Sequence, residues 1–213
     1  MSTLLELFLD AADGRFPPAD GTVSVIPSWR AGLSAVVSFT AHTIIATDTP
    51  EVLKDVRPDA YGAALHPGVL ATLARYPARI GVADATLGGR GRGGGSAELV
   101  VRTDLDDHPR VVYARAIRDD VTVHGAPEGA DDHGLVTVGT GLGGRREISI
   151  ELFGDQPPGT GRRLIDEALR LIPDQQPVFA AVAPGNARSL RAFLASGFAP
   201  IGSEVIIEHH PVG

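Results

Sequence analysis

The 213-residue chain contains no cysteine, one methionine, one tryptophan and a single lysine, Lys54. The absence of cysteine excludes a disulfide framework, a thiol nucleophile and a cysteine-based zinc site. The histidines never occur in a His-Glu-x-x-His spacing or a comparable one, so we expect no metal. A cytoplasmic protein is the simplest expectation from this composition.

Long apolar runs are also missing. No run approaches the roughly 18 to 20 residues that a membrane span requires, so we expect no membrane partner. The first ten residues lack the basic leading segment of a signal peptide, and Glu6 and Asp10 interrupt their apolar part. The spacing of Leu4, Phe8 and their neighbours predicts a short amphipathic helix instead.

Positive charge is scarce, because the formal net charge is −7. A general nucleic-acid binder needs a basic face, so we expect no nucleic-acid partner. A cationic or amine substrate is compatible with the acidic balance. Hydrophobic residues make up 43% of the chain, which is enough for the core of one large domain, or of one domain with an extension.

The first hundred residues carry short patterns but no sharp motif. Apolar β-branched runs predict strands at 22–26, 35–46 and 80–87, and short helices are predicted at 50–57 and 67–76. The segment GGRGRGGGS, residues 88–96, has no apolar periodicity and no helix after it. It predicts a flexible surface loop.

The second half has clearer periodicity. Strands are predicted at 110–117, 121–124, 135–140, 146–152, 178–182 and 205–208, and helices at 160–172 and 186–196. The run REISIEL alternates, so that Glu147 and Glu151 share one face of their strand while Ile148 and Ile150 share the other. The order predicts a mixed α/β fold in which antiparallel strands precede a β-α-β unit.

Two glycine patterns compete for a functional role. GTGLGG, residues 139–144, matches a dinucleotide fingerprint formally, but a strand follows it rather than a helix, so it predicts a hairpin turn. QPPGTG, residues 156–161, does open a helix. The free amides and partial positive charge of a helix N-terminus suit a phosphate, and glycine lets a ligand approach the backbone closely.

The second pattern resembles the pyrophosphate loop of the GNAT superfamily, the acyl-CoA-dependent N-acyltransferases. After one further strand, PGNARSLRAFLASGF resembles another block of that family, with an Asn at a helix start, a small residue three positions later, an aromatic residue seven positions later, and then Gly-Phe. The resemblance is clearest over residues 110–209. The matching residues of the second block are Asn186, Ser189, Phe193, Gly197 and Phe198.

The resemblance implies a mixed, mostly antiparallel sheet in which a parallel strand pair, 146–152 and 178–182, splays apart and is flanked by helices. Residues 101–213 would form the acyl-CoA-binding core. Residues 1–100 would supply an extension together with the first strand and helices of the fold. A homodimer is compatible with the resemblance.

The resemblance also implies a ligand, acetyl-CoA, lying between the splayed strands. The pyrophosphate of acetyl-CoA would contact the backbone amides near the helix start, and its pantetheine would contact the end of the strand. Asn186 would hydrogen-bond to the pantetheine arm. The residues implied in binding are Leu152, Phe153, Gln156, Gly159, Thr160, Gly161, Arg162, Asn186, Ser189 and Phe193. The Asn is equally an ordinary helix N-cap.

The chemistry asks for a base and an oxyanion donor. Glu147 or Glu151, or a water held by one of them, would take the proton of the attacking amine, and the amide of Leu152 would stabilise the developing oxyanion. Solvent-facing strand glutamates are the plain alternative for both. His124 is a lower-ranked base.

Two departures from the family pattern weaken the enzyme interpretation. Pro157 and Pro158 occupy loop positions where other residues would offer N–H groups. Many family members carry a tyrosine as general acid where this chain has Phe193, so Ser189 or water would have to serve.

The sequence therefore predicts an N-acyltransferase that moves an acetyl group from acetyl-CoA to a small-molecule or peptide amine by direct attack in a ternary complex. A non-catalytic acyl-CoA-binding protein on the same fold is the alternative. A nucleotide-binding module is a third interpretation, which fits the glycine loop but not the segment from Asn186 to Phe198.

Overall fold

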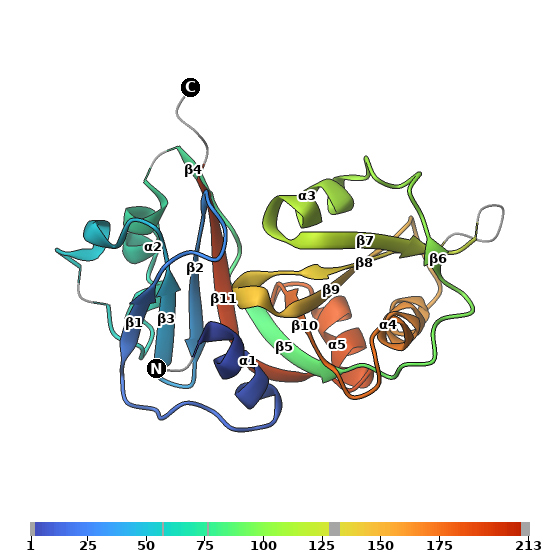
Figure 1. Ribbon diagram of the computed structural model, residues 1–213, viewed down its shortest axis with the longest axis horizontal. Coiled ribbons are helices and arrows are strands. Elements are labelled where there is room, and N and C mark those ends of the chain that lie inside the picture. Colours follow the sequence, from blue (N-terminus) through green and yellow to red (C-terminus); the bar gives the residue numbers. More distant parts are fainter. Residues whose placement is uncertain (1–2, 57, 76, 128–132, 210–213) are drawn as a thin grey trace. The chain divides into compact units, whose positions relative to one another are not determined.

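The computed structural model describes residues 3–56, 58–75, 77–127 and 133–209. The chain divides into two compact units (Figure 1). Unit 1 comprises Met1–Thr86 and Ile201–Gly213, and unit 2 comprises Leu87–Pro200. Unit 1 thus includes the last strand of the chain as well as its first 86 residues. The division expected near residue 100, into an extension and an acyl-CoA-binding core, stays a prediction.

Unit 1 is built on a sheet with the order β1-β3-β2-β11, and β4 also pairs with β11. The pairing of β1 with β3 is parallel, and β2 is antiparallel to both β3 and β11. The strands are β1 (Val23–Ile26), β2 (Leu33–Phe39), β3 (His42–Ala46), β4 (Ala78–Ile80) and β11 (Ala199–His209).

Helices α1 (Leu4–Ala12) and α2 (Pro67–Ala74) cover opposite faces of β2. The Phe8 ring of α1 meets Phe39 edge to face, with centroids 5.7 Å apart. Helix α2 packs instead into the cluster that contains Val36 and Val205. Because side chains alternate along a strand, Val36 and Phe39 point to opposite faces.

Unit 2 contains the sheet segment β5-β10-β9-β8-β7-β6. From β6 to β9 neighbouring strands are antiparallel, whereas β9 and β10 are parallel. The strands are β5 (Asp84–Arg90, from Leu87 onward in this unit), β6 (Val100–Val101), β7 (Asp119–Gly125), β8 (Gly134–Thr140), β9 (Arg146–Leu152) and β10 (Pro177–Val182). The helices are α3 (Pro109–Ile117), α4 (Thr160–Leu171) and α5 (Ala187–Ala195).

The parallel pair β9 and β10 is splayed. In these two fully described strands, the paired register consists of Phe179 opposite Glu147, near the start of β9. Beyond that pair β9 continues to Leu152 alongside β8, and α4 connects the two strands as a β-α-β unit. The fold class expected from the sequence, a mostly antiparallel sheet with one splayed parallel pair, is confirmed.

The predicted strand at 110–117 is wrong, because this segment forms α3. His108 caps the helix by accepting a hydrogen bond from the Arg110 amide at 3.2 Å, and Pro109 occupies the first helical position. Val111, Ala114 and Ile117 recur at helical spacing and are all buried. Packing of this stripe prevails over the strand preference of the β-branched residues.

Several boundaries differ from expectation. The predicted strand 35–46 is a hairpin of β2 and β3 that turns at Ala41, whose φ is +50°. The predicted strand 80–87 is replaced by β4 and β5, and the strand at 205–208 extends back to Ala199. The helix predicted at 50–57 is the 3₁₀ turn η1 (Pro50–Leu53); residues 57 and 76 lie outside the described part.

The segment 88–96 is more ordered than a flexible loop. Strand β5 extends to Arg90, and the next amides bind the end of α4: Arg92 donates to the Leu169 carbonyl at 2.8 Å and Gly93 to that of Ile172 at 2.8 Å. The last carbonyls of a helix lack hydrogen-bond partners within the helix. The amides of this glycine-rich segment serve as their donors.

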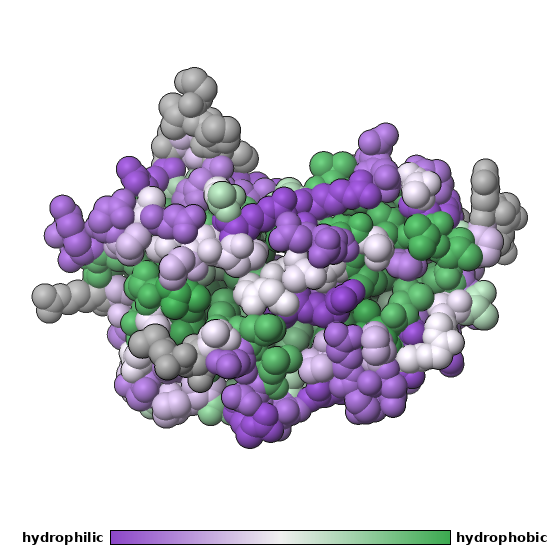
Figure 2. All heavy atoms as spheres, in the orientation of Figure 1, coloured by the Kyte–Doolittle hydropathy of each residue, from purple (hydrophilic) through white to green (hydrophobic). Residues whose placement is uncertain are grey.

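Hydrophilic side chains (purple) and hydrophobic side chains (green) are interspersed over the face shown in Figure 2. In unit 2, hydrophobic residues gather over the region of α3 and β7. Val112 of α3 is 55% exposed, and Val101, which pairs with β7, is 63% exposed.

Candidate functional site

A cleft of about 770 Å³ opens in unit 2 beside the end of β9. It is formed by the end of that strand, the loop that follows, and the first turns of α4 and α5, with Arg110 of α3 at one side. The lining residues are Arg110, Ile150, Glu151, Leu152, Pro157, Pro158, Gly159, Gly161, Arg162, Asn186, Arg188, Ser189, Arg191, Ala192 and Ala195.

The N-terminus of α4 points its backbone into this cleft. The N-cap residue Gly159 has φ +95°, a conformation that favours glycine, and no side chain caps the helix. The Arg163 amide donates to the Gly159 carbonyl at 3.0 Å, but the amides of Gly161 and Arg162 have no hydrogen-bond partner in the described part of the chain. These donors and the helix dipole form a site for an anion.

The loop that precedes α4 is held by its own hydrogen bonds. The side-chain amide of Gln156 donates to the Phe153 carbonyl at 2.6 Å, and the Thr160 hydroxyl donates to the Pro157 carbonyl at 2.9 Å. Gln156 and Thr160 thus shape the loop. Neither lines the cleft, although the sequence predicted both as ligand contacts.

Arginine side chains give the cleft a positive charge despite the acidic chain. Arg162 lies 3.7 Å from Asp166 in a loose ion pair. Arg188 and Arg191, in the first turns of α5, have no ion pair or hydrogen-bonded side chain among the described residues. Sequence reasoning did not name these two, although the spacing A-R-S-L-R places both near the start of a predicted helix.

The strand end presents one backbone donor to the cleft. The amide of Phe153 donates to the His133 carbonyl at 3.0 Å, on the side of β8. Successive amides along an antiparallel strand point to opposite sides. The Leu152 amide is therefore directed away from β8, toward the gap between β9 and β10.

Phe153 itself faces away from the cleft. Its ring lies 5.5 Å from that of His108 and packs against the cluster of Val111, Val123 and Leu135. Its amide is engaged with β8, so it offers the cleft neither a side chain nor a donor.

Gly161 lies close above the strand. A Cβ atom at this position would be 3.6 Å from Leu152 Cδ1 and 3.9 Å from Ile150 Cδ1. A small residue here keeps the space between the helix start and β9 narrow but open.

Glu151 lines the cleft beside Arg110. Arg110 Nε donates to Glu151 Oε2 at 2.9 Å, and each side chain is 38% exposed. The pair is thus accessible to a ligand. Sequence analysis predicted Glu151 here, but it could not predict Arg110, because that segment had the pattern of a strand.

Glu147 lies elsewhere, and its predicted place in the site is corrected. It is only 2% exposed, and its two oxygens accept hydrogen bonds from Arg118 Nε at 2.7 Å and Arg145 Nε at 2.8 Å. Burial alone raises the pKa of Glu147, but attraction by Arg145 and Arg118 outweighs it, so the pKa lies below its usual range. The carboxylate is a buried structural anion that does not line the cleft.

The start of α5 contributes Asn186 and Ser189. Asn186 Oδ1 accepts a hydrogen bond from the Ser189 amide at 3.1 Å, so the Asn caps the helix. Both residues line the cleft. Capping uses only the side-chain oxygen, and the side-chain NH₂ stays available to a ligand.

Phe193 belongs to the core rather than to the cleft wall. It is 3% exposed and meets Phe198 edge to face, with centroids 5.0 Å apart. Residue 193 therefore does not line the cleft, where the sequence analysis expected it.

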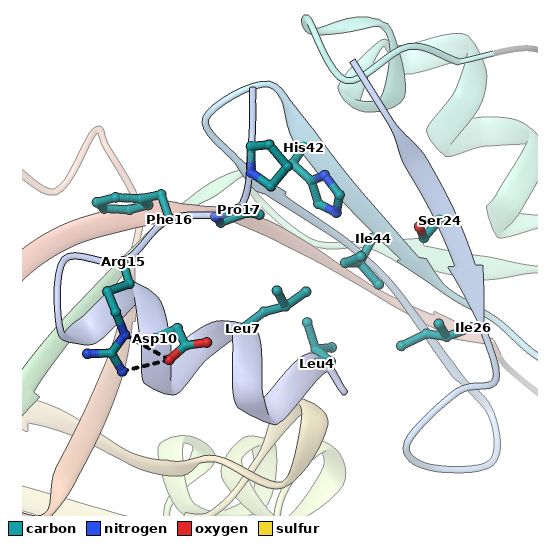
Figure 3. A pocket seen from close by; sticks show the side chains of 11 residues that line it. Leu4, Leu7, Asp10, Arg15, Phe16, Pro17, Ser24, Ile26, His42 and Ile44 are labelled. Carbon is teal, nitrogen blue, oxygen red and sulfur yellow. Dashed lines mark hydrogen bonds and ion pairs between the residues drawn. The ribbon is translucent and has the colours of Figure 1, made fainter. Parts of the chain in front are cut away.

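Unit 1 has a smaller cavity of about 440 Å³, shown in Figure 3. Leu4 and Leu7 of α1 and Ile44 of β3 make it largely apolar. Its arginine, Arg15, is bound by Asp10 at 2.6 Å and Asp13 at 2.9 Å. The cavity therefore has fewer available positive groups and hydrogen-bond donors for an anion than the cleft of unit 2 has.

The described residues contain no group of three or more histidine, cysteine or acidic side chains arranged to hold a metal ion. Within the same residues, no helix combines the length and apolar character needed to cross a membrane.

No protein-family model matches the chain, and no curated protein matches it. Solved structures do resemble it. They include the aminoglycoside acetyltransferase AAC(6′)-Ib in complex with coenzyme A. It is 16% identical, the match covers 53% of this chain and 94% of that chain, and the TM-score is 0.39. A putative GNAT-family acetyltransferase from Novosphingobium aromaticivorans is 12% identical, the match covers 64% of this chain and 69% of that chain, and the TM-score is 0.43.

A GCN5-related N-acetyltransferase from Kribbella flavida is 13% identical, the match covers 69% of this chain and 65% of that chain, and the TM-score is 0.40. These are likenesses of fold between distant sequences. At such identities and TM-scores they carry no conclusion about function.

Proposed function

We propose that unit 2 binds acyl-CoA, most simply acetyl-CoA, and transfers its acyl group to an amine. The observation that carries this proposal is the start of α4: unpartnered amides of Gly161 and Arg162 face a cleft beside two splayed parallel strands. A ligand that fits must be long, with an anionic part at the helix and a polar arm that runs along the strand.

The phosphates and the pantetheine arm of acyl-CoA would each have a partner in the cleft. The pyrophosphate would bind the free amides of α4, with Arg162 adding charge. Arg188 and Arg191 would neutralise the remaining phosphate charge. The pantetheine amides would lie along β9 near Leu152, and the side-chain NH₂ of Asn186 would donate to the arm.

Direct attack accounts for the transfer, since the chain has no cysteine to carry the acyl group. The amine nitrogen forms a bond to the thioester carbon, and the C–S bond breaks. The Leu152 amide stabilises the oxyanion. Glu151 takes a proton from the nitrogen, and the CoA thiolate receives a proton from Ser189 or water.

A non-catalytic acyl-CoA-binding protein is the second candidate. It is favoured by Phe193, which is buried and offers no acid. Binding without turnover over a broad panel of amines would support it. Tighter binding of ATP or NAD than of CoA would instead favour a nucleotide-binding module.

Calorimetric titration with acetyl-CoA tests the proposal. We expect micromolar affinity for the wild type, and at least about tenfold weaker binding for Gly161→Glu, because a carboxylate would then oppose the pyrophosphate at the helix start. Arg163→Gln is the matched control. It lowers the net charge equally and lies in the same turn, but Arg163 binds Glu98 outside the cleft.

Equal affinities of Gly161→Glu and the wild type would show that acetyl-CoA does not use this helix. Absence of binding by the folded wild type would remove the support for both acyl-CoA candidates.

A further inference from the structure

The Arg110–Glu151 pair has binding capacity that it does not use. Only Nε of Arg110 and Oε2 of Glu151 meet, at 2.9 Å. In the described part of the chain, the terminal nitrogens of Arg110 and the second oxygen of Glu151 make no further hydrogen bond. A guanidinium carries five N–H donors and a carboxylate about four acceptor sites, so most of the capacity of each group is free.

The free groups lie at the reacting end of the proposed acyl-donor cleft. Glu151 directly precedes Leu152, whose amide points into the gap between β9 and β10. Both members of the pair line the cleft and are 38% exposed. A molecule bound to the pair would therefore sit beside the acyl carbon, where the acceptor amine must be.

Resting on the proposed function, we infer that the acceptor is an α-amino acid, or a molecule that ends in the same zwitterion. Its ammonium would bind Glu151 Oε1 while its carboxylate binds the terminal N–H groups of Arg110 in a forked arrangement. The existing Arg110–Glu151 hydrogen bond need not break, because the ligand bridges unused atoms.

The spacing of the pair selects the α-amino acid over other amines. The two charged groups touch, so a ligand must hold its own opposite charges close together. An α-amino acid separates them by one carbon, whereas an ω-amino acid separates them further. A simple amine satisfies Glu151 and leaves the free N–H groups of Arg110 without a partner.

The reaction balances with this acceptor. The bound ammonium gives one proton to Glu151, which passes it to solvent, and the neutral amine attacks the thioester carbon. The N–C bond forms, the C–S bond breaks, and the second nitrogen proton is in effect transferred to the thiolate. The products are an N-acyl amino acid, CoA thiol and one proton.

The test compares the twenty common amino acids with their carboxamides, which keep the ammonium but lack the carboxylate. With acetyl-CoA as donor, release of the CoA thiol is followed for each. We expect at least one amino acid to exceed its carboxamide about tenfold or more in kcat/KM. Arg110→Gln should raise KM for that amino acid about 10- to 100-fold, the range for losing a hydrogen-bonded charge pair.

Because Arg110 also contacts the base Glu151, the effect is measured as a ratio: the preference in kcat/KM for that amino acid over its carboxamide should fall about 10-fold or more in Arg110→Gln. Arg115→Gln is the matched control, since Arg115 lies on the same helix and binds Asp106 instead. The inference would be overturned if carboxamides or simple amines have the same kcat/KM as the amino acids. It would also be overturned if Arg110→Gln keeps the preference for the amino acid over its carboxamide. The inference would also be overturned if the protein binds acetyl-CoA but acylates no amino acid. If the protein does not bind acetyl-CoA at all, the proposed function itself would be overturned.

Discussion

Two glutamates on one strand face show how far single residues can be predicted. The alternation of REISIEL correctly places Glu147 and Glu151 on the same face. Their roles diverge because Arg118 and Arg145 hold Glu147, while Glu151 remains at the open end of the strand. The pattern of one strand cannot reveal this difference, since Arg118 arrives from a distant segment.

The buried cluster gives a prediction at the same scale. Glu147→Gln should lower the free energy of unfolding by about 3–5 kcal/mol at pH 7, because it leaves two guanidinium groups buried without their anion. Denaturant unfolding measures this. Glu98→Gln, which breaks an exposed pair with Arg163, should cost less than about 1 kcal/mol. A Glu147→Gln effect as small as that of the control would contradict the assignment.

The same cluster sets a pH dependence. Since the pKa of Glu147 is lower in the folded state, its ionisation stabilises the fold at pH values above its unfolded pKa, about 4.3. That contribution is lost as the pH falls from there through the folded pKa. The stability difference between wild type and Glu147→Gln should therefore shrink in acid. If the stability difference grows on acidification instead, the pKa of Glu147 is raised rather than lowered in the folded state.

At the scale of elements, the helices and strands that build the cleft were the best predicted. β9 has the expected bounds, and α4, β10 and α5 begin and end within about two residues of expectation. Strong periodicity and clear end signals explain this success. α3 was missed because Val111 and Val112 favour strands locally, and with it the contribution of Arg110 to the site.

The glycine-rich segment was also misjudged, because sequence does not show which atoms approach it. A Cβ at Gly91 would collide with the backbone oxygen of Pro173. Gly91→Ala should therefore cost about 1–3 kcal/mol of stability. Gly185→Ala, where no atom lies within 4 Å of the added Cβ and φ is not positive, is the control and should change stability by less than about 0.5 kcal/mol.

Thermal or denaturant unfolding compares the two variants, and hydrogen exchange adds an independent reading. The amides of Arg92 and Gly93, which bind the end of α4, should exchange slowly. Rapid exchange there, together with a neutral Gly91→Ala, would restore the interpretation as a flexible loop.

At the scale of the whole molecule, bulk properties describe the protein less well than local ones. The net charge of the chain is −7, yet the cleft of unit 2 gathers Arg110, Arg162, Arg188 and Arg191. The sequence analysis did not predict that β11 joins unit 1, where this strand pairs with β2, far away in sequence. Long-range pairing of this kind leaves no local pattern.

The proposed function depends above all on binding of the acyl-CoA pyrophosphate at the start of α4. Amide NMR of the labelled protein, titrated with CoA, tests it most directly. We predict that the largest shifts fall on Gly161 and Arg162, with smaller ones at Leu152 and around Asn186. Shifts confined to the unit 1 cavity, or none at saturating CoA, would contradict the claim.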